Sequence, residues 1–563
     1  MNSKRTSLVI IMAMFFVLAC SKQPITIAPN KVEFVDGRVL HAGAPLFDGM
    51  GDYHHAVTTN GSTAQRYFNQ GLIMSFAFNH AEAVRSFRAA QQLDEACAMC
   101  FWGEALALGP NINVTSDGKA VMADEARLKA HAAIQQAVAL KAGVSQKERD
   151  YIDALATRYN GDIKTPRDAL DLAYIEAMRE LSQKYPKDDD AAAFFADSLM
   201  TIMPWDYWLD EETPKPLTAE VIDILEKIIG RTPEHPLALH LYIHAVEASS
   251  TPERAEAAAD RLLNLVPSAG HLVHMPSHIY WRVGRYQDAS EANIKAVAVD
   301  EAYIAACNVQ GFYPAAYYPH NIHFIWASTS MEGRSQIAIE TAQKIAANVS
   351  YEMIEQFPRI ESFKTIPMLA LTNFGRWEEV LDVPQPPDHL TFSNAIWHYV
   401  RATAFARKGD IASMQAEYEK LVPLRHTSGV KHLDTIAYPA SMLLNIADEL
   451  VQGEIAWLEG KQKNAIDNFK KAVIIQDELP YTEPPFWYYP TRLTLGKALL
   501  ESGLALEAEQ VYRQNLKNYP KNGWAMFGLI QSIEKQNKNA NEVREAFEAA
   551  WKNADISLTA SRF

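Results

Sequence analysis

Residues 496–520 have the sequence GKALLESGLALEAEQVYRQNLKNYP, and this stretch predicts the fold. Apolar residues recur every three or four positions on both sides of Gly503, which is typical of two amphipathic helices joined at a glycine turn. The small Gly496 lets the two helices approach closely, and Tyr512 can fill the space toward the next helix. Pro520 would end the second helix. The stretch therefore indicates a pair of antiparallel helices.

The same spacing recurs along the chain. Twelve positions separate Gly496 from Ala508 and four more lead to Tyr512, and these offsets are repeated twice, in Gly71, Ala83 and Phe87 and in Gly453, Ala465 and Phe469. Less regular copies are marked by turn glycines at Gly284, Gly333, Gly375 and Gly409. The pattern resembles the tetratricopeptide repeat, a helix pair of about 34 residues.

Five groups of short motifs extend this resemblance to most of residues 50–540: FNHAEA at 78–83, CAMC at 97–100 with GPNIN at 109–113, HMPSH at 274–278, PHN at 319–321 and EPPFW at 483–487. With them the chain resembles a family of large bacterial tetratricopeptide proteins. The resemblance implies the fold and supplies no activity.

We therefore expect an all-α fold, a right-handed α-solenoid of helix pairs that bury their apolar faces against neighbouring pairs. No strand-like alternation and no glycine-rich phosphate loop is found. The expected organisation comprises a lipoprotein signal peptide (1–19), an acylated tether (20–50), N-terminal repeats (51–235), central histidine-rich repeats (236–350) and C-terminal repeats (351–563).

The first twenty residues have the features of an export signal. Lys4 and Arg5 precede an apolar run too short to span a membrane comfortably, and residues 17–20 (VLAC) resemble the lipobox of bacterial lipoproteins. The resemblance implies cleavage before Cys20 and acylation of its thiol, and Ser21 favours the outer membrane, facing the periplasm. The alternative is an ordinary secretory signal with a chance cysteine.

The net charge limits the classes of ligand, and the cysteine count limits the possible disulfides. The formal net charge of −15 disfavours nucleic acid and anionic lipid as ligands, so we expect a protein or peptide partner and a membrane contact only through the lipid. Without Cys20 three thiols remain, and an odd number does not indicate a disulfide framework. Cys97 and Cys100 are expected to be buried small apolar residues, with a redox or metal-binding pair as the alternative.

Seven of the 17 histidines lie between residues 240 and 323, in clusters with three- and four-residue spacings that stack imidazoles on one face of a helix. Counting back from the turn glycines places them on the concave first helices of three consecutive repeats, together with Glu247. The predicted groove residues are His240, His244, Glu247, His271, His274, His278, His320 and His323.

Three interpretations of these histidines remain open. They can bind a zinc or copper ion, for which we select His240, His244, His274, His278, His320 and His323, because imidazole is the commonest ligand for these metals. They can recognise an acidic or peptide ligand, or they can be packing residues with hydrogen-bonded neighbours. No nucleophile has an activating context, so no catalytic residue is selected.

The leading functional hypothesis is a lipid-anchored scaffold of the cell envelope that binds a partner in a histidine-lined groove. The alternative is a metal-binding protein or metal-dependent hydrolase. The aromatic loop at residues 478–490 is expected to pack one solenoid turn against another, or else to border a ligand site.

Overall fold

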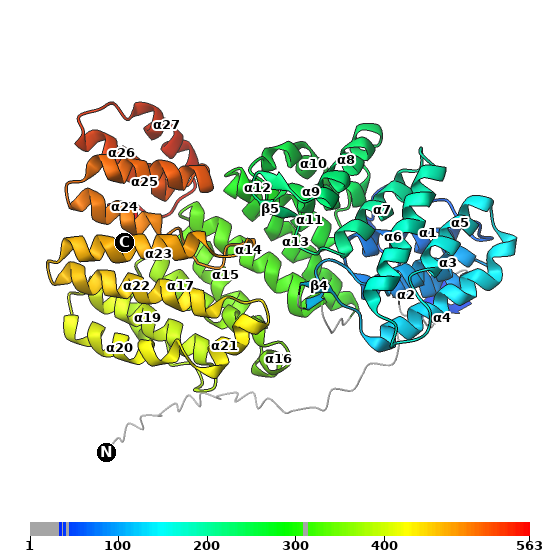
Figure 1. Cartoon of the computed structure of the whole chain (residues 1–563), viewed down its shortest axis with the longest axis horizontal. Helices are drawn as coiled ribbons and strands as arrows, with labels where there is room; N and C mark the ends of the chain where they lie inside the picture. The colour runs from blue at the N-terminus through cyan, green and yellow to red at the C-terminus, as the bar shows by residue number, and fades with distance from the viewer. Residues whose placement is uncertain (1–32, 36–37, 41–43, 117, 308–312) are drawn as a thin grey trace, which may run out of the picture.

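The computed structural model describes residues 33–35, 38–40, 44–116, 118–307 and 313–563. These residues form an elongated stack of helices in which the chain runs from one end of the molecule to the other (Figure 1). The expected all-α solenoid of helix pairs is confirmed. The predicted signal peptide and Cys20 lie outside the described residues.

The helices of the N-terminal repeats are α1 (Ser62–Phe76), α2 (His80–Leu93), α3 (Ala98–Ala107), α4 (Asp124–Leu140), α5 (Gln146–Ala156), α6 (Arg167–Lys184), α7 (Asp189–Thr201) and α8 (Pro216–Arg231). Those of the central repeats are α9 (Pro236–Val246), α10 (Glu256–Leu262), α11 (Gly270–His274), α12 (Pro276–Arg282), α13 (Tyr286–Cys307), α14 (Tyr318–Met331) and α15 (Ser335–Asn348). Those of the C-terminal repeats are α16 (Tyr351–Gln356), α17 (Ile366–Asn373), α18 (Trp377–Asp382), α19 (Thr391–Arg407), α20 (Ile411–Leu424), α21 (Ser428–Thr435), α22 (Ala440–Leu458), α23 (Gln462–Asp477), α24 (Arg492–Glu501), α25 (Ala505–Asn518), α26 (Gly523–Lys535) and α27 (Asn541–Ala550).

The turns between paired helices contain the glycines that the sequence indicated. All five have φ between 67° and 79°, a left-handed conformation that residues with a Cβ rarely adopt: Gly284, Gly333, Gly375, Gly409 and Gly503. Each ends the first helix of a pair and reverses the chain into the second.

Aromatic rings lock neighbouring pairs together. The ring of Phe87 in α2 lies between Gly71 of α1 and Gly103 of α3, where an added Cβ would approach it to 2.7 Å and 2.3 Å respectively. Tyr512 of α25 occupies the same place between Gly496 and Gly528. The glycines therefore create the space that the aromatic side chain fills, as the repeat spacing predicted.

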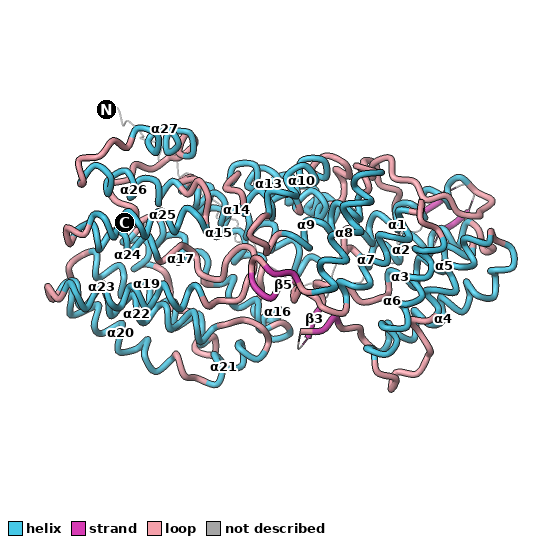
Figure 2. Tube along the Cα trace, turned by 45° about the horizontal axis from the view of Figure 1, so that its top comes forward, coloured by secondary structure: helices cyan, strands magenta, loops and turns pink. Residues whose placement is uncertain are grey.

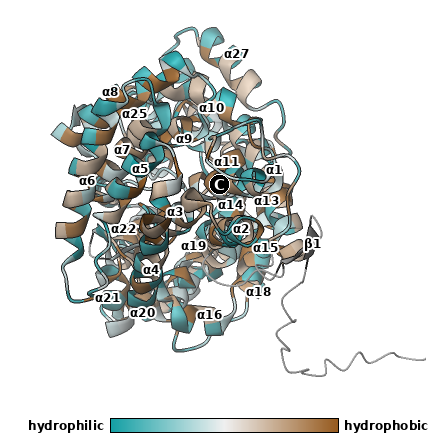
Figure 3. Cartoon of the chain, turned by 90° about the vertical axis from the view of Figure 1, so that its right-hand side faces the viewer, coloured by the Kyte–Doolittle hydropathy of each residue, from teal (hydrophilic) through white to brown (hydrophobic). Residues whose placement is uncertain are grey.

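Two large apolar cores run through the described residues. One extends from Ala44 to Tyr317 and the other from Val297 to Ala540, so they meet at α13 and α14. In a view along the long axis, most helices carry both hydrophilic and hydrophobic residues, as amphipathic helices do (Figure 3). Residues distant in sequence also meet: Trp524 Nε1 donates to the Ser330 carbonyl at 3.0 Å.

The strand content is small, as expected for an all-α fold. Three short antiparallel hairpins occur among the described residues, visible as magenta segments in Figure 2: β1 (Glu33–Val35) with β2 (Arg38–Leu40), β3 (Thr115–Ser116) with β4 (Lys119–Ala120), and β5 (Trp208–Asp210) with β6 (Thr213–Pro214). Strands this short lack detectable alternation, which explains why periodicity missed them. Within the described ranges, no helix combines the length and apolarity needed to cross a bilayer.

Candidate metal centre

The predicted histidines lie on the first helices of three successive repeats. His240 and His244 are on α9, His271 and His274 on α11, His278 on α12, and His320 and His323 on α14. The first five are at most 3% exposed, and the last two are half-buried. This placement corrects one expectation: the side chains face one another inside the protein and do not line an open groove.

Six of the seven histidines form two groups in which one nitrogen per ring lies within 4.8 Å of the others. We call His274, His278 and His320 the first group, and His240, His244 and His271 the second group. The two groups touch, because the ring centroids of His244 and His278 are 5.6 Å apart, as are those of His271 and His274. Four helices thus bring six imidazoles into one cluster.

The first group contains a direct contact between two ring nitrogens. His274 Nε2 and His278 Nε2 are 2.9 Å apart. His278 Nδ1 faces Glu247 Oε2 at 2.6 Å, and His274 Nδ1 faces Asn293 Oδ1 at 2.6 Å. The Asn293 amide donates through Nδ2 to the Ala289 carbonyl, which orients its oxygen toward His274. Both Nδ1 atoms therefore donate, so in the neutral form of the two rings each Nε2 carries a lone pair.

Glu247 connects the two groups. It is 1% exposed, and its Oε1 accepts from His244 Nδ1 at 2.7 Å while its Oε2 accepts from His278 Nδ1. Burial opposes ionisation, but the facing His278 and His244 outweigh it and hold the pKa of Glu247 well below its usual range. Glu247 is thus an ionised carboxylate that orients one imidazole of each group.

In the second group, several buried nitrogens lack a hydrogen-bond partner among the described residues. They are His240 Nε2, His244 Nε2 and both ring nitrogens of His271. The other nitrogen of His240, Nδ1, faces the Phe76 carbonyl at 2.6 Å and is a donor. Leaving such a group unsatisfied costs about 1–3 kcal/mol, so a partner that binds any of these nitrogens would be stabilising.

The imidazoles are held in the neutral form that metals require. Burial lowers the pKa of His240, His271, His274 and His320 well below the ordinary value, and the neighbouring histidines lower it further. Protonation would place several positive charges next to one another in a dry interior. These four imidazoles are therefore uncharged nitrogen donors at neutral pH.

The N-terminal repeat closes over the second group. The ring of Phe78, between α1 and α2, lies 4.6 Å from His240 and 5.4 Å from His271, centroid to centroid. Phe78 has a φ of 53°, a conformation that costs energy for a bulky residue and tends to occur at functional sites. The superhelix thus brings its first repeat into contact with the central repeats.

Sequence reasoning missed the second carboxylate of the site, Glu483. It lies in the loop between α23 and α24, with Oε2 3.6 Å from His278 Nδ1. Burial raises its pKa well above the usual range, and the charge of Glu247 raises it further. Tyr481 of the same loop donates to Glu483 and, at 3.3 Å, to Glu247. The density of aromatic residues marked this loop in the sequence, but it could not predict which part of the fold the loop contacts.

The aromatic loop packs into the C-terminal core and also contacts the histidine cluster. Trp487 and Tyr489 are buried in the C-terminal core, while Tyr481 and Glu483 border the histidine cluster. An apolar pocket adjoins the site here, lined by Trp281, Trp326, Pro484, Pro485 and Tyr519 among others.

His323 is not brought into either group. Its ring stacks on Trp326 at 5.3 Å and contacts Phe363 at 5.7 Å, and burial lowers its pKa to about 3. It lies three residues after His320 on α14, and because three residues fall about 60° short of a full turn, its ring packs against Trp326 and Phe363 instead. His271, which was not selected as a ligand, takes its place in the cluster.

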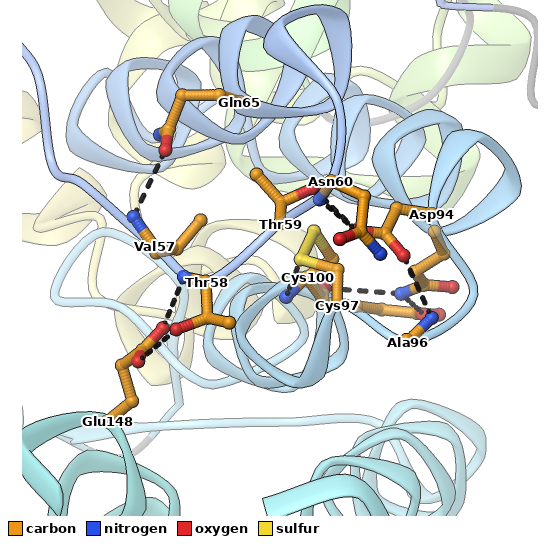
Figure 4. The surroundings of a disulfide bond; sticks show 12 residues. Val57, Thr58, Thr59, Asn60, Gln65, Asp94, Ala96, Cys97, Cys100 and Glu148 are labelled. Atoms are coloured by element: carbon orange, nitrogen blue, oxygen red, sulfur yellow. Dashed lines mark hydrogen bonds between the residues drawn. A yellow bond between two sulfur atoms is a disulfide. The ribbon is translucent and has the colours of Figure 1, made fainter. Parts of the chain in front are cut away.

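The expectation for Cys97 and Cys100 also changes, because they form a disulfide at the start of α3 (Figure 4). Both are fully buried. Next to them, Asp94 Oδ2 accepts from Thr59 Oγ1 and from the backbone N–H of Asn60, both at 2.7 Å. These bonds fix the segment that precedes α1 against the start of α3. The odd thiol count argued against a framework but not against one local bridge.

Comparison with known proteins gives a fold resemblance only. No family model and no curated protein matches the chain. Among solved structures, a human IFIT1 dimer with m7Gppp-AAAA is 13% identical at a TM-score of 0.28, covering 89% of this chain and 92% of that one. The P58(IPK) TPR domain is 12% identical at 0.23, covering 87% and 98%, and Naa15/Naa10 bound to HypK-THB is 11% identical at 0.21, covering 87% and 70%. At these scores the fold is assigned from the helix pairs of this chain itself.

Proposed function

We propose that this protein binds a transition-metal ion, zinc or copper, in the buried histidine cluster. The observation that carries the proposal is the pair of Nε2 atoms of His274 and His278, which lie 2.9 Å apart while both Nδ1 atoms are committed to acceptors. With both rings neutral, a cation held between the two Nε2 lone pairs stabilises this arrangement. Nitrogens bound to one ion at 2.0–2.1 Å are about 2.9 Å apart at a right angle and about 3.3 Å apart at a tetrahedral angle.

The surroundings of the first group support this assignment. Metal-bound histidines usually donate their other ring nitrogen to a carboxylate or carbonyl, and Glu247 and Asn293 accept these bonds here. His320 supplies a third imidazole to the same group. Three imidazoles leave a coordination position open, which is typical of sites that transfer or activate a ligand.

The buried setting favours metal binding over recognition of a large partner. A peptide needs an accessible surface, whereas five of the seven histidines are at most 3% exposed. A protein partner remains our prediction for the outer surface of the solenoid, since helical-repeat scaffolds present extended surfaces.

The proposal is tested by elemental analysis of the purified mature chain. We expect bound zinc or copper, with one equivalent lost in the double variant His274→Ala/His278→Ala and none lost in His323→Ala, whose ring lies on the same helix as His320 but outside the group. Circular dichroism checks that the variants stay folded. Metal well below one equivalent in the wild type, unchanged by added zinc or copper, would overturn the proposal.

We also propose that the chain is exported and anchored by a lipid on Cys20, facing the periplasm from the outer membrane. The basis is Lys4 and Arg5, the short apolar run and the terminal cysteine of residues 17–20. The Cys97–Cys100 bridge supports export, because such bonds persist in oxidising compartments.

A further inference from the structure

The second group contains more unpaired nitrogens than the first and has no role in the function proposed so far. Its rings belong to His240, His244 and His271, which are 0–2% exposed. Four of its six ring nitrogens have no hydrogen-bond partner among the described residues.

We propose that this group binds a second metal ion, so that the protein contains a two-metal centre. The inference rests on the proposed metal-binding function of the first group. His240 Nδ1 is committed to the Phe76 carbonyl and His244 Nδ1 to Glu247, so both present bare Nε2 lone pairs. With His271 they place three donor nitrogens within 4.8 Å of one another. That is the ligand set of a three-imidazole site with an open position.

The two sites are physically coupled through Glu247. One of its oxygens orients His244 of the second group and the other orients His278 of the first. A single carboxylate thus fixes the tautomer of one ligand in each set, and its charge offsets part of the positive charge of two buried ions.

The geometry places the two ions next to each other. Direct ring contacts join the groups at His244–His278 and His271–His274, with no intervening side chain between these pairs. Paired metals at such close range act together on one bound ligand, which distinguishes this centre from two independent storage sites.

The test counts metal ions per chain. Purified mature protein, stripped by a chelator and reloaded with zinc or copper, should hold two equivalents after gel filtration. His240→Ala/His244→Ala should hold one and His274→Ala/His278→Ala should hold one. His323→Ala, the matched control, should hold two. His271→Phe keeps a ring in the same space and should also hold one, which preserves the test if the double variants fail to fold.

Copper-loaded protein gives an independent measure of proximity. Two adjacent cupric ions should give a magnetically coupled electron paramagnetic resonance spectrum, and each single-site variant should give the spectrum of an isolated ion. One equivalent in the wild type that is unaffected by the His240→Ala/His244→Ala change would overturn the second site and leave the first intact. No metal at all would overturn both, and two equivalents with uncoupled spectra would overturn the paired centre.

Discussion

At the scale of the residue, the centre depends on hydrogen bonds that decide which nitrogen of each ring is free. Glu247 and Asn293 each accept from an Nδ1 atom, so every oriented imidazole turns its Nε2 inward. Spacing of three and four residues alone would align the rings without choosing the donor atom. The carboxylate and amide behind the rings make that choice.

Replacing Glu247 with glutamine tests this orienting role. The amide keeps the shape but can accept through only one of its two atoms, so one of the two histidines loses its acceptor. We expect metal affinity about 10–100-fold weaker, measured by competition with a chelator. Glu417→Gln is the matched control, because Glu417 accepts from His398 at 2.6 Å outside the cluster. Equal affinity in the Glu247 variant and wild type would exclude the role.

The lowered imidazole pKa values predict how the metal-free protein responds to acid. In the unfolded chain these histidines protonate near pH 6.5, while burial keeps His240, His271, His274 and His320 neutral in the folded chain well below that pH. The unfolded state then binds more protons, so stability falls as pH drops below about 6.5.

For each such histidine, the free energy of unfolding falls by about 1.4 kcal/mol for every unit by which the pH drops in that window. Chemical denaturation of the metal-free protein at several pH values between 7.5 and 4.5 measures the slope. His320→Phe removes one titrating group and should lower the slope by about that amount. A pH-independent unfolding free energy over this range would contradict the prediction.

At the scale of the element, helix pairs are joined by an aromatic ring seated between two glycines. Phe87 contacts Gly71 and Gly103 of successive first helices and is fully buried. This packing affects the position of the histidine-bearing helices only indirectly. The stacking angle of each helix pair is set by its contact with the neighbouring pair.

Shortening Phe87 to alanine should therefore destabilise the N-terminal repeats. The expected loss is about 3–5 kcal/mol, since a buried ring is replaced by a cavity between packed helices. Urea denaturation followed by circular dichroism measures it. Phe357→Ala, at a position 43% exposed, serves as control and should change stability by less than about 0.5 kcal/mol. Equal effects of the two substitutions would show that the ring does not join the pairs.

At the scale of the whole molecule, the superhelix joins distant segments at the site. Phe76 lies 164 residues before His240, and Tyr481 lies 234 residues after Glu247, yet both are hydrogen-bonded to them. The centre therefore depends on contacts between segments that are far apart in the sequence.

The cellular location of the protein is tested by changing Cys20, the predicted site of acylation. Expressed in a bacterium that processes lipoproteins, the wild type should fractionate with membranes, and Cys20→Ala should be released or left unprocessed. The physical reason is that an acyl chain partitions into a bilayer at about 0.8 kcal/mol per buried methylene. Membrane retention of a processed Cys20→Ala protein would exclude the lipid anchor.

The sequence by itself determined the helix pairs, because their glycines, aromatic residues and 3.6-residue period are local features. Gly284 and Gly333 also located His274, His278 and His320 on successive first helices. Tertiary structure alone decided that the rings are buried, that His323 turns away and that Glu483 joins from the distant loop. The physical reason is that superhelical curvature sums small angles between many neighbouring pairs, and no short stretch of sequence contains that sum.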